Sequence, residues 1–141
     1  MATINEEWWE AINSSLADGT PCLLGTVSGD AQPQISPKGS ILVHDSSSLA
    51  FWERSKRTAL ANIHDNQRVV VYYRNPERAE QLPQGACLRF YGTCRIVESG
   101  PEREAVMNKV VQRELDADKG RTGVAVIIDI ARITDLRGAD L

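Results

Sequence analysis

Three long segments of β-type sequence constrain the fold of this chain most strongly. Residues 68–74, "RVVVYYR", form an almost continuous apolar run, which is typical of a buried strand. Residues 86–98, "ACLRFYGTCRIVE", and residues 123–133, "GVAVIIDIARI", predict two longer strands. Gly92 lies in the middle of the second segment, and glycine inside a strand marks a bulge or a bend. The chain must therefore build a substantial sheet.

The first half of the chain predicts two hairpins. Ser28-Gly29-Asp30 has turn chemistry and separates two strand-like segments. Pro33 and Pro37 limit the hydrogen bonds that the second segment can donate, so this strand lies at an edge or is bulged or interrupted. Residues 40–44 and 48–53 predict a second hairpin, joined by a serine-rich turn.

Three helices are expected beside these strands. The first follows a capping box of Thr3 and Glu6 and ends at Asp18-Gly19. The second covers residues 58–65, and the third opens at Pro101. Their buried sides are predicted to be Ile4, Trp8, Ile12 and Leu16 in the first helix, Ala59, Leu60 and Ile63 in the second, and Val106, Val110, Val111 and Leu115 in the third.

Six or seven strands, joined mostly by hairpins, predict a mainly β protein with peripheral helices (α+β), arranged as a small antiparallel barrel. At 141 residues, the chain fits one domain covering residues 1–141. Alternating strand–helix units and a glycine-rich strand–helix turn are both absent from the sequence, which argues against a Rossmann fold.

The composition excludes several classes of partner. The net charge is −3, whereas binding to nucleic acids or to anionic membranes usually requires a broad basic surface. No segment approaches the length of a transmembrane span, and the acidic, aromatic N-terminus "MATINEEWWE" is unlike a signal peptide. We therefore expect a cytoplasmic protein that binds neither nucleic acid nor membranes.

The cysteines and histidines predict neither a disulfide framework nor a metal site. Cys22, Cys87 and Cys94 show no CxxC spacing, which suits a reducing compartment. His44 and His64 are the only histidines, and they have no paired spacing for zinc.

Ser55-Lys56-Arg57 lies where a predicted strand gives way to a predicted helix. A helix N-terminus carries free N–H groups and partial positive charge, so two cations here suggest an anion supplied from outside. Ser55 is the expected N-cap, Lys56 supplies a point charge, and Arg57 supplies a bidentate fork suited to phosphate. The alternative is that Lys56 and Arg57 are solvated charges near Glu53 and Asp65.

Two other groups of residues admit two interpretations each. The segment "QISPKGS", residues 34–40, is either part of a site or an exposed strand end. Five aromatic residues lie on three predicted strands, mostly as core, although one or two could line a flat ligand. These residues are Trp52, Tyr72, Tyr73, Phe90 and Tyr91.

The order of these features resembles the flavin-binding split-barrel family that includes pyridoxamine 5′-phosphate oxidase. The resemblance covers roughly residues 20–98, and the last predicted strand is compatible with it. It rests on a Pro-x-x-Ser-Pro-like segment, a strand, a basic turn, a helix carrying Asn, and a strand beginning with Arg-Val. Here these features are residues 33–37, residues 49–53, residues 55–57, Asn62 and Arg68-Val69.

The resemblance implies a split β-barrel that binds FMN in a cleft between the subunits of a homodimer. Lys56 and Arg57 would hold the FMN phosphate, although their order here is Lys-Arg where Arg-Lys is usual. The expected cofactor-binding residues along the flavin and at the turn are Ser36, Lys38, Phe51, Trp52, Ser55, Lys56 and Arg57.

One departure from the family bears on the substrate. Pyridoxamine-phosphate oxidases grip the substrate phosphate with a Tyr, Arg and Ser series after the long strand, and residues 99–120 contain no tyrosine. We therefore expect an FMN-dependent oxidoreductase whose small-molecule substrate is not pyridoxamine phosphate. No residue pair is assigned as general acid and base. The alternatives are a non-catalytic flavin-binding or sensing protein, the same barrel with a deazaflavin or haem, and a β-barrel interaction module.

Overall fold

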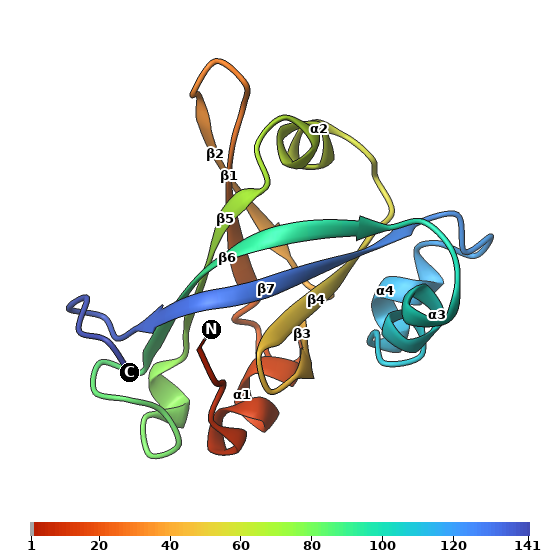
Figure 1. The fold of residues 1–141 in the computed structure, drawn as a ribbon. Coiled ribbons are helices and arrows are strands. Elements are labelled where there is room, and N and C mark those ends of the chain that lie inside the picture. Colours follow the sequence, from red (N-terminus) through yellow and green to blue (C-terminus); the bar gives the residue numbers. More distant parts are fainter. Residues whose placement is uncertain (1) are drawn as a thin grey trace.

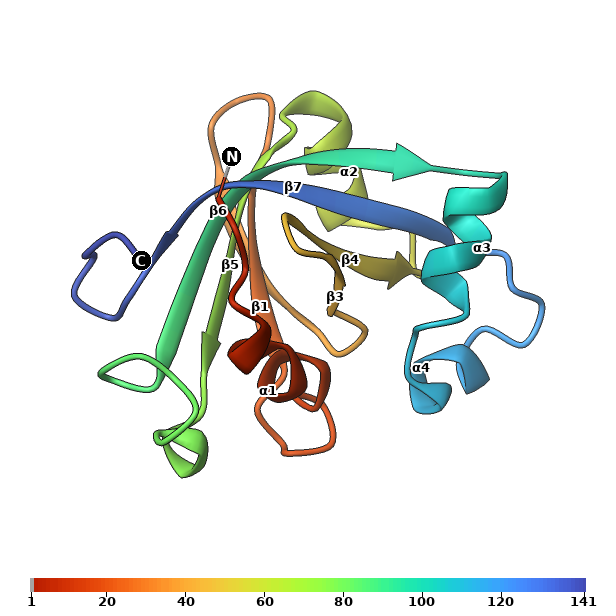
Figure 2. The same cartoon turned by 60° about the horizontal axis from the view of Figure 1, so that its bottom comes forward.

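Seven strands pair into one antiparallel sheet in the order β2-β1-β5-β6-β7-β4-β3, in a computed structural model that describes residues 2–141. The sheet curls so that the hairpin of β3 and β4 comes round towards β1 and β2 (Figures 1 and 2). This arrangement confirms the mainly β, split-barrel fold with peripheral helices. The strands are β1 (Cys22–Val27), β2 (Pro33–Lys38), β3 (Leu42–Asp45), β4 (Ser48–Glu53), β5 (Arg68–Arg74), β6 (Cys87–Val97) and β7 (Val124–Thr134).

The helices lie outside the curled sheet. Figure 1 shows α2 at one end of the barrel, α1 at the opposite end, and α3 and α4 together at one side. The helical elements are η1 (Glu6–Trp8), α1 (Trp9–Asn13), α2 (Thr58–Asp65), η2 (Pro76–Arg78), α3 (Pro101–Met107) and α4 (Gln112–Asp116).

Strand β4 separates two hydrophobic clusters, because both of its faces are buried. Leu49 and Phe51 join the main core inside the barrel, together with side chains from β1, β5, β6 and β7. Ala50 and Trp52 point the other way, into a smaller cluster covered by α3 and α4. This second cluster includes Val106 of α3, Leu115 of α4, and Val110 from the link between the two helices. The end of β4, where the predicted phosphate site begins, is therefore held from both sides.

The predictions for the hairpins and for Gly92 are confirmed. β1 pairs with β2 around the turn at residues 28–32, and β3 pairs with β4. β2, which contains Pro33 and Pro37, is an edge strand. The pairing of β6 with β7 shifts register between Tyr91 and Gly92, and a Cβ atom on Gly92 would lie 2.4 Å from the carbonyl oxygen of Asp129. Only glycine permits this approach.

The prediction that β5 is buried throughout is wrong for one of its faces. Val69, Val71 and Tyr73 are buried in the core, whereas Val70 and Tyr72 are only partly covered. The outer face of β5 is apolar, but no element of the described chain packs over it closely enough to bury it.

The first predicted helix is much shorter than expected, and Thr3 does not cap it. The backbone N–H of Ile4 donates to the carbonyl of Ser46 at 2.6 Å, so the chain before residue 5 runs along the barrel instead of coiling. Asn5 caps the 3-10 turn η1 by accepting from the N–H of Glu7, and α1 ends at Asn13.

The third predicted helix is two helices. α3 ends at Met107, and the backbone of Val111 is extended, with φ −59° and ψ 139°, where it precedes α4. Val106 and Leu115 are buried as predicted, whereas Val111 is only partly covered. The break lets Val110 turn into the cluster beneath Trp52, a tertiary contact that helical periodicity does not anticipate.

Candidate functional site

The basic turn, residues 54–57, connects the end of β4 to the start of α2. The helix is fixed on the barrel by its buried side, which includes Leu60 and Ile63. The amide of Asn62, itself buried, donates to the hydroxyl of Thr26 on β1 at 3.0 Å. Asn62 therefore anchors the helix whose N-terminus carries the two cations.

The N-cap of α2 is Arg57, so the prediction that Ser55 caps the helix is wrong. Ser55 lies two residues before this cap, and its hydroxyl instead donates to Glu53 Oε1 at 2.8 Å. The Arg57 side chain makes no capping hydrogen bond, and the first turn of α2 contains no acidic residue. Lys56 has a positive φ of 49°, an uncommon backbone conformation for a residue with a side chain. Such strain is frequently found at functional sites.

Lys56 and Arg57 are exposed, and within residues 2–141 neither forms an ion pair. The alternative interpretation placed their charges near Glu53 and Asp65. Glu53 is already paired with Lys38, and Asp65 forms no ion pair with either cation. The two cations therefore stand beside the uncapped N–H groups of α2 without a protein anion.

Lys38 and Glu53 form a second charged group beside the basic turn. Lys38 Nζ donates to Glu53 Oε2 at 2.7 Å, and Glu53 is only 2% exposed. The ammonium also lies 5.6 Å from the centre of the Phe51 ring. Ser36 shares the face of β2 that carries Lys38, since alternate residues of a strand point the same way, and its hydroxyl accepts from the Gln34 amide at 3.1 Å.

The predicted cofactor-binding residues are divided between two cavities and the core. A cavity of about 190 Å³ is lined by Lys38, Trp52 and Ser55, together with Pro37, Gly39, Ser40, Glu53, Arg54 and Glu114. Lys56 lines a different cavity of about 420 Å³, together with Leu60, His64, Ile96, Glu98, Arg103, Thr122, Gly123 and Val124. Ser36 and Arg57 line neither of these two cavities, and Phe51 is fully buried in the main core.

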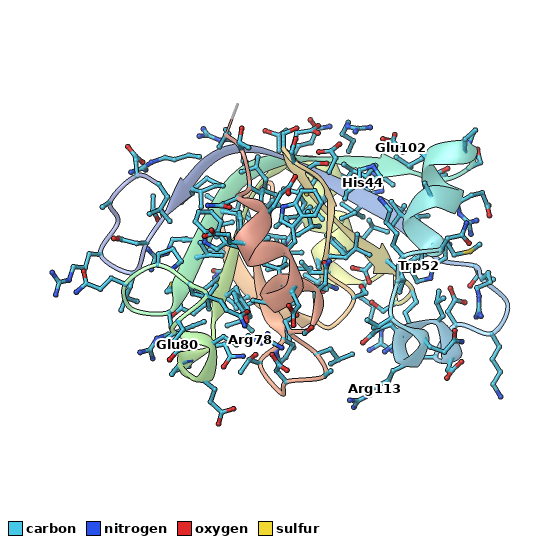
Figure 3. All side chains as sticks on the ribbon, turned by 90° about the horizontal axis from the view of Figure 1, so that it is seen from below. His44, Trp52, Arg78, Glu80, Glu102 and Arg113 are labelled. Atoms are coloured by element: carbon cyan, nitrogen blue, oxygen red, sulfur yellow. The ribbon has the colours of Figure 1, made fainter. Side chains whose placement is uncertain are left out.

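The rings of Phe51 and Trp52 support β4 from inside instead of offering a flat face to a ligand. Trp52 is 3% exposed, and its indole N–H donates to Asp118 Oδ2 at 2.8 Å. The guanidinium of Arg103 lies over the same ring, 4.7 Å from its centre. Figure 3 shows Trp52 beside the helices α3 and α4.

Asp118 organises a loop that the sequence analysis missed. Its carboxylate accepts from the backbone N–H groups of Thr122 and Gly123, at 3.0 and 2.8 Å, as well as from Trp52. Burial alone would raise the pKa of Asp118, but these hydrogen bonds outweigh it and lower the pKa from 3.8 to about 2. The sequence signal that could have identified this loop is Asp118 two residues before Gly120, because Asp side chains often accept hydrogen bonds from the backbone of their own turn.

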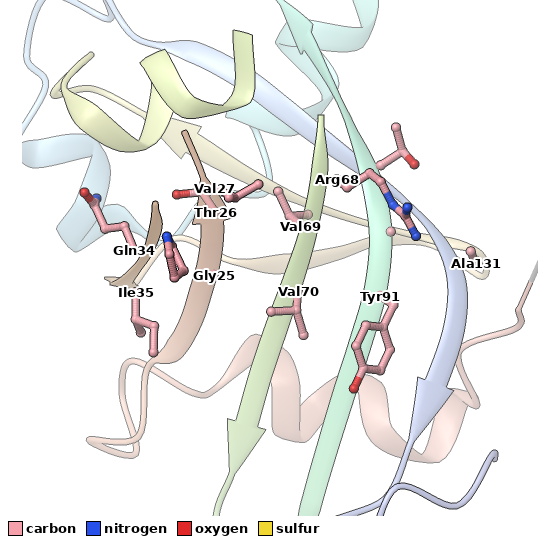
Figure 4. A pocket seen from close by; sticks show the side chains of 13 residues that line it. Gly25, Thr26, Val27, Gln34, Ile35, Arg68, Val69, Val70, Tyr91 and Ala131 are labelled. Atoms are coloured by element: carbon pink, nitrogen blue, oxygen red, sulfur yellow. The ribbon is translucent and has the colours of Figure 1, made fainter. Parts of the chain in front are cut away.

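A groove of about 520 Å³ crosses the outer face of β2, β1, β5 and β6 (Figure 4). Its lining is almost entirely apolar and includes Val27, Val70 and Tyr91, with Arg68 at one end. Ile35 on the edge strand β2 also lines the groove and is 73% exposed. This groove is the partly covered outer face of β5 described above.

The two histidines differ in their surroundings. His44 lies against α3, with Nε2 3.6 Å from a carboxylate oxygen of Glu102 (Figure 3). His64 is exposed and lines the cavity that contains Lys56. No group of three or more potential metal ligands occurs in residues 2–141. In the same part of the chain, no helix is both long and apolar enough to cross a membrane.

Both the sequence and the fold are similar to those of known proteins. The sequence profile of the pyridoxamine 5′-phosphate oxidase family matches residues 8–135. HupZ from Group A Streptococcus is a similar solved structure, with 27% identity, a TM-score of 0.75, and 98% of each chain covered. No curated protein matches the chain.

Two more distant structures share the fold. An FMN-binding protein from Syntrophomonas wolfei has 14% identity and a TM-score of 0.67, covering 92% of this chain and 86% of its own. An F420 reductase has 21% identity and a TM-score of 0.60, covering 86% of this chain and 94% of its own.

Proposed function

Because the chain belongs to the pyridoxamine 5′-phosphate oxidase family, we propose that it is an FMN-binding oxidoreductase acting on a small-molecule substrate. The observation that supports this most is the pair of free cations, Lys56 and Arg57, at the uncapped N-terminus of α2. Charge-assisted contacts from both side chains and from the first-turn N–H groups suit a phosphate monoester.

The other predicted residues take supporting roles in this proposal. Lys38 and Ser36, on one face of β2, lie along the ligand, and Ser55 contributes its hydroxyl or backbone at the turn. Phe51 and Trp52 fix the position of β4 from within the two clusters. When bound, FMN would supply the hydride-transfer chemistry, whereas the protein supplies binding, orientation and exclusion of water.

The proposed substrate is a small molecule other than pyridoxamine 5′-phosphate. Residues 99–120 lack the tyrosine of the family's substrate-phosphate grip, so we expect no efficient oxidation of pyridoxamine 5′-phosphate at micromolar concentration. We place the protein in the cytoplasm, since its three cysteines are free and suit a reducing compartment.

We also propose that a second copy of the chain covers the outer groove, forming a homodimer with flavin at the subunit interface. The apolar lining and the exposed Ile35 favour a protein surface over water. Ile35→Asp should convert the dimer to a monomer in analytical ultracentrifugation at micromolar concentration. Leu141→Asp is the matched control, since Leu141 is 50% exposed but lies outside the groove lining. A monomeric wild-type protein in the presence of FMN would contradict the dimer.

The absorbance spectrum of freshly purified protein tests the cofactor. We expect the flavin bands of FMN, released on denaturation and rebound on titration. A haem or deazaflavin spectrum would redirect the proposal to the other cofactors, and the absence of both chromophore and FMN binding would favour an interaction module. Turnover of a reductant with an electron acceptor separates an oxidoreductase from a non-catalytic flavin-binding or sensing protein.

A further inference from the structure

We infer that Glu53 is an internal anion that competes with a ligand phosphate for Lys38 and Ser55, and so sets the preference of the site for phosphorylated ligands. This inference rests on the proposed function, because it assigns a specificity-determining residue to the same site. Nothing in the family resemblance assigned a role to Glu53.

The Glu53 carboxylate accepts hydrogen bonds from three donors at the start of the basic turn. Oε2 accepts from Lys38 Nζ at 2.7 Å. Oε1 accepts from the Ser55 hydroxyl at 2.8 Å and from the Ser55 backbone N–H at 3.3 Å. An ammonium, a hydroxyl and a backbone N–H are also the donors that phosphate oxygens bind. The Glu53 carboxylate is therefore hydrogen-bonded to the Lys38 and Ser55 donors that could otherwise bind phosphate and extend the site towards β2.

The charges around the neighbouring cavity balance each other. Lys38 pairs with Glu53, and Arg54 Nε lies 3.6 Å from Glu114 Oε2. Both cations that line the 190 Å³ cavity therefore have a protein anion, in contrast to Lys56 and Arg57. A phosphate is therefore attracted by the unpaired Lys56 and Arg57, whereas the ion-paired side chains of the 190 Å³ cavity offer it no net positive charge.

Neutralising Glu53 changes this balance by one charge. Lys38 is only 14% exposed at its side chain, and a largely buried ammonium without a partner carries a high desolvation penalty. That ammonium can recover a partner from the phosphate of an added ligand. The carboxylate's own repulsion of the phosphate disappears at the same time.

The experiment compares FMN with riboflavin, which has the same ring but no phosphate, by titration of flavin fluorescence. Glu53→Gln should tighten FMN binding by roughly tenfold, the size of one charge-assisted hydrogen bond, and change riboflavin affinity by less than about twofold. Lys38→Met/Glu53→Gln should lose the gain, because the freed ammonium is gone. Glu53→Asp, which keeps the charge but shortens the side chain, should give a smaller gain and serves if Glu53→Gln does not fold.

Each outcome decides the inference. Equal changes for FMN and riboflavin, no change in either, or a gain that persists without Lys38 would overturn it. Lys56→Ala/Arg57→Ala reports separately on the proposed function. If FMN affinity falls in that variant but does not rise in Glu53→Gln, only the inference fails. If neither the wild-type protein nor any variant binds FMN, both the proposed function and the inference fail.

Discussion

The buried carboxylates of Asp118 and Glu53 both lie close to Trp52, but they accept hydrogen bonds from different kinds of donor. Asp118 accepts from the Trp52 indole and from the backbone of Thr122 and Gly123, all of them neutral donors held in one loop. Glu53, which follows Trp52 directly, accepts from the charged ammonium of Lys38 and from Ser55. The first set of donors has no other role in the described structure, whereas the second can be taken over by a ligand anion.

The difference shows how a structural carboxylate can be told from one at a binding site. Both groups are satisfied, and both are almost fully buried. Asp118 closes a loop against a core residue, so its loss should reduce stability. Glu53 borders a cavity and precedes the free cations Lys56 and Arg57 by three and four residues, so its loss should change ligand affinity.

The largest effect is expected from removing both free cations. Lys56→Ala/Arg57→Ala should weaken FMN binding on the order of a hundredfold or more, because each charge-assisted contact contributes roughly 1.5–3 kcal/mol. Riboflavin affinity should change far less, and the fold should survive, since exposed cations add little stability. Fluorescence titration with both flavins measures the differential.

The matched control is Arg113→Ala/Lys119→Ala. These two cations are also exposed and free of ion pairs in residues 2–141, so the variant removes the same net charge elsewhere. FMN affinity should stay near the wild-type value. Equal loss of FMN and riboflavin in the Lys56→Ala/Arg57→Ala variant would instead assign the basic turn a role in shaping the protein.

Removing the structural carboxylate should lower the free energy of unfolding. Asp118→Ala leaves the Trp52 indole N–H and the Gly123 N–H without their acceptor, which costs roughly 2–4 kcal/mol. Urea denaturation followed by tryptophan fluorescence measures the change. Asp116→Ala, two residues earlier and exposed, should cost less than about 0.5 kcal/mol. Similar losses in both variants would remove the distinction drawn for Asp118.

The Asp118 loop should also be visible in the pH dependence of stability. Its pKa is lowered from 3.8 to about 2 on folding, so the unfolded chain binds the proton first as the pH falls. The contribution is fully present above about pH 5 and is lost as the pH falls towards 2, amounting to about 2 kcal/mol. Asp118→Asn should lack this component when unfolding is compared at pH 5 and pH 3. Identical pH profiles would contradict the assignment.

The smallest effect is expected at the rim of the same cavity. Glu114 pairs with Arg54 at 3.6 Å, and both side chains are partly exposed. Glu114→Gln should change FMN affinity by less than about twofold, because exposed ion pairs are weak and screened. A gain equal to that of Glu53→Gln would mean that net charge, and not the buried carboxylate, governs the site.

Local sequence patterns were enough for most of the sheet. Alternating and continuous apolar runs located the strands, and the two prolines of β2 marked it as an edge. Gly92 marked the bulge of β6, because only a residue without Cβ can approach the facing backbone so closely. The same patterns failed for the helices, where Ile4 bonds to Ser46 and Val111 interrupts the helix that periodicity predicts. Those departures depend on contacts between segments far apart in the chain.

The class of fold, the family, and the position of the cationic turn before α2 could all be inferred from the sequence, since these depend on residue types and their spacing. Which hydrogen-bond donors are free for a ligand depends on contacts that form only in the folded chain. Only the folded chain brings Lys38 on β2 to within 2.7 Å of Glu53 on β4, and only the folded chain takes the Ser55 hydroxyl away from the helix cap. The charged residues can be counted from the sequence, but which of them form ion pairs depends on distances that only folding creates. The proposed preference of the site for a phosphorylated ligand therefore depends on the folded structure.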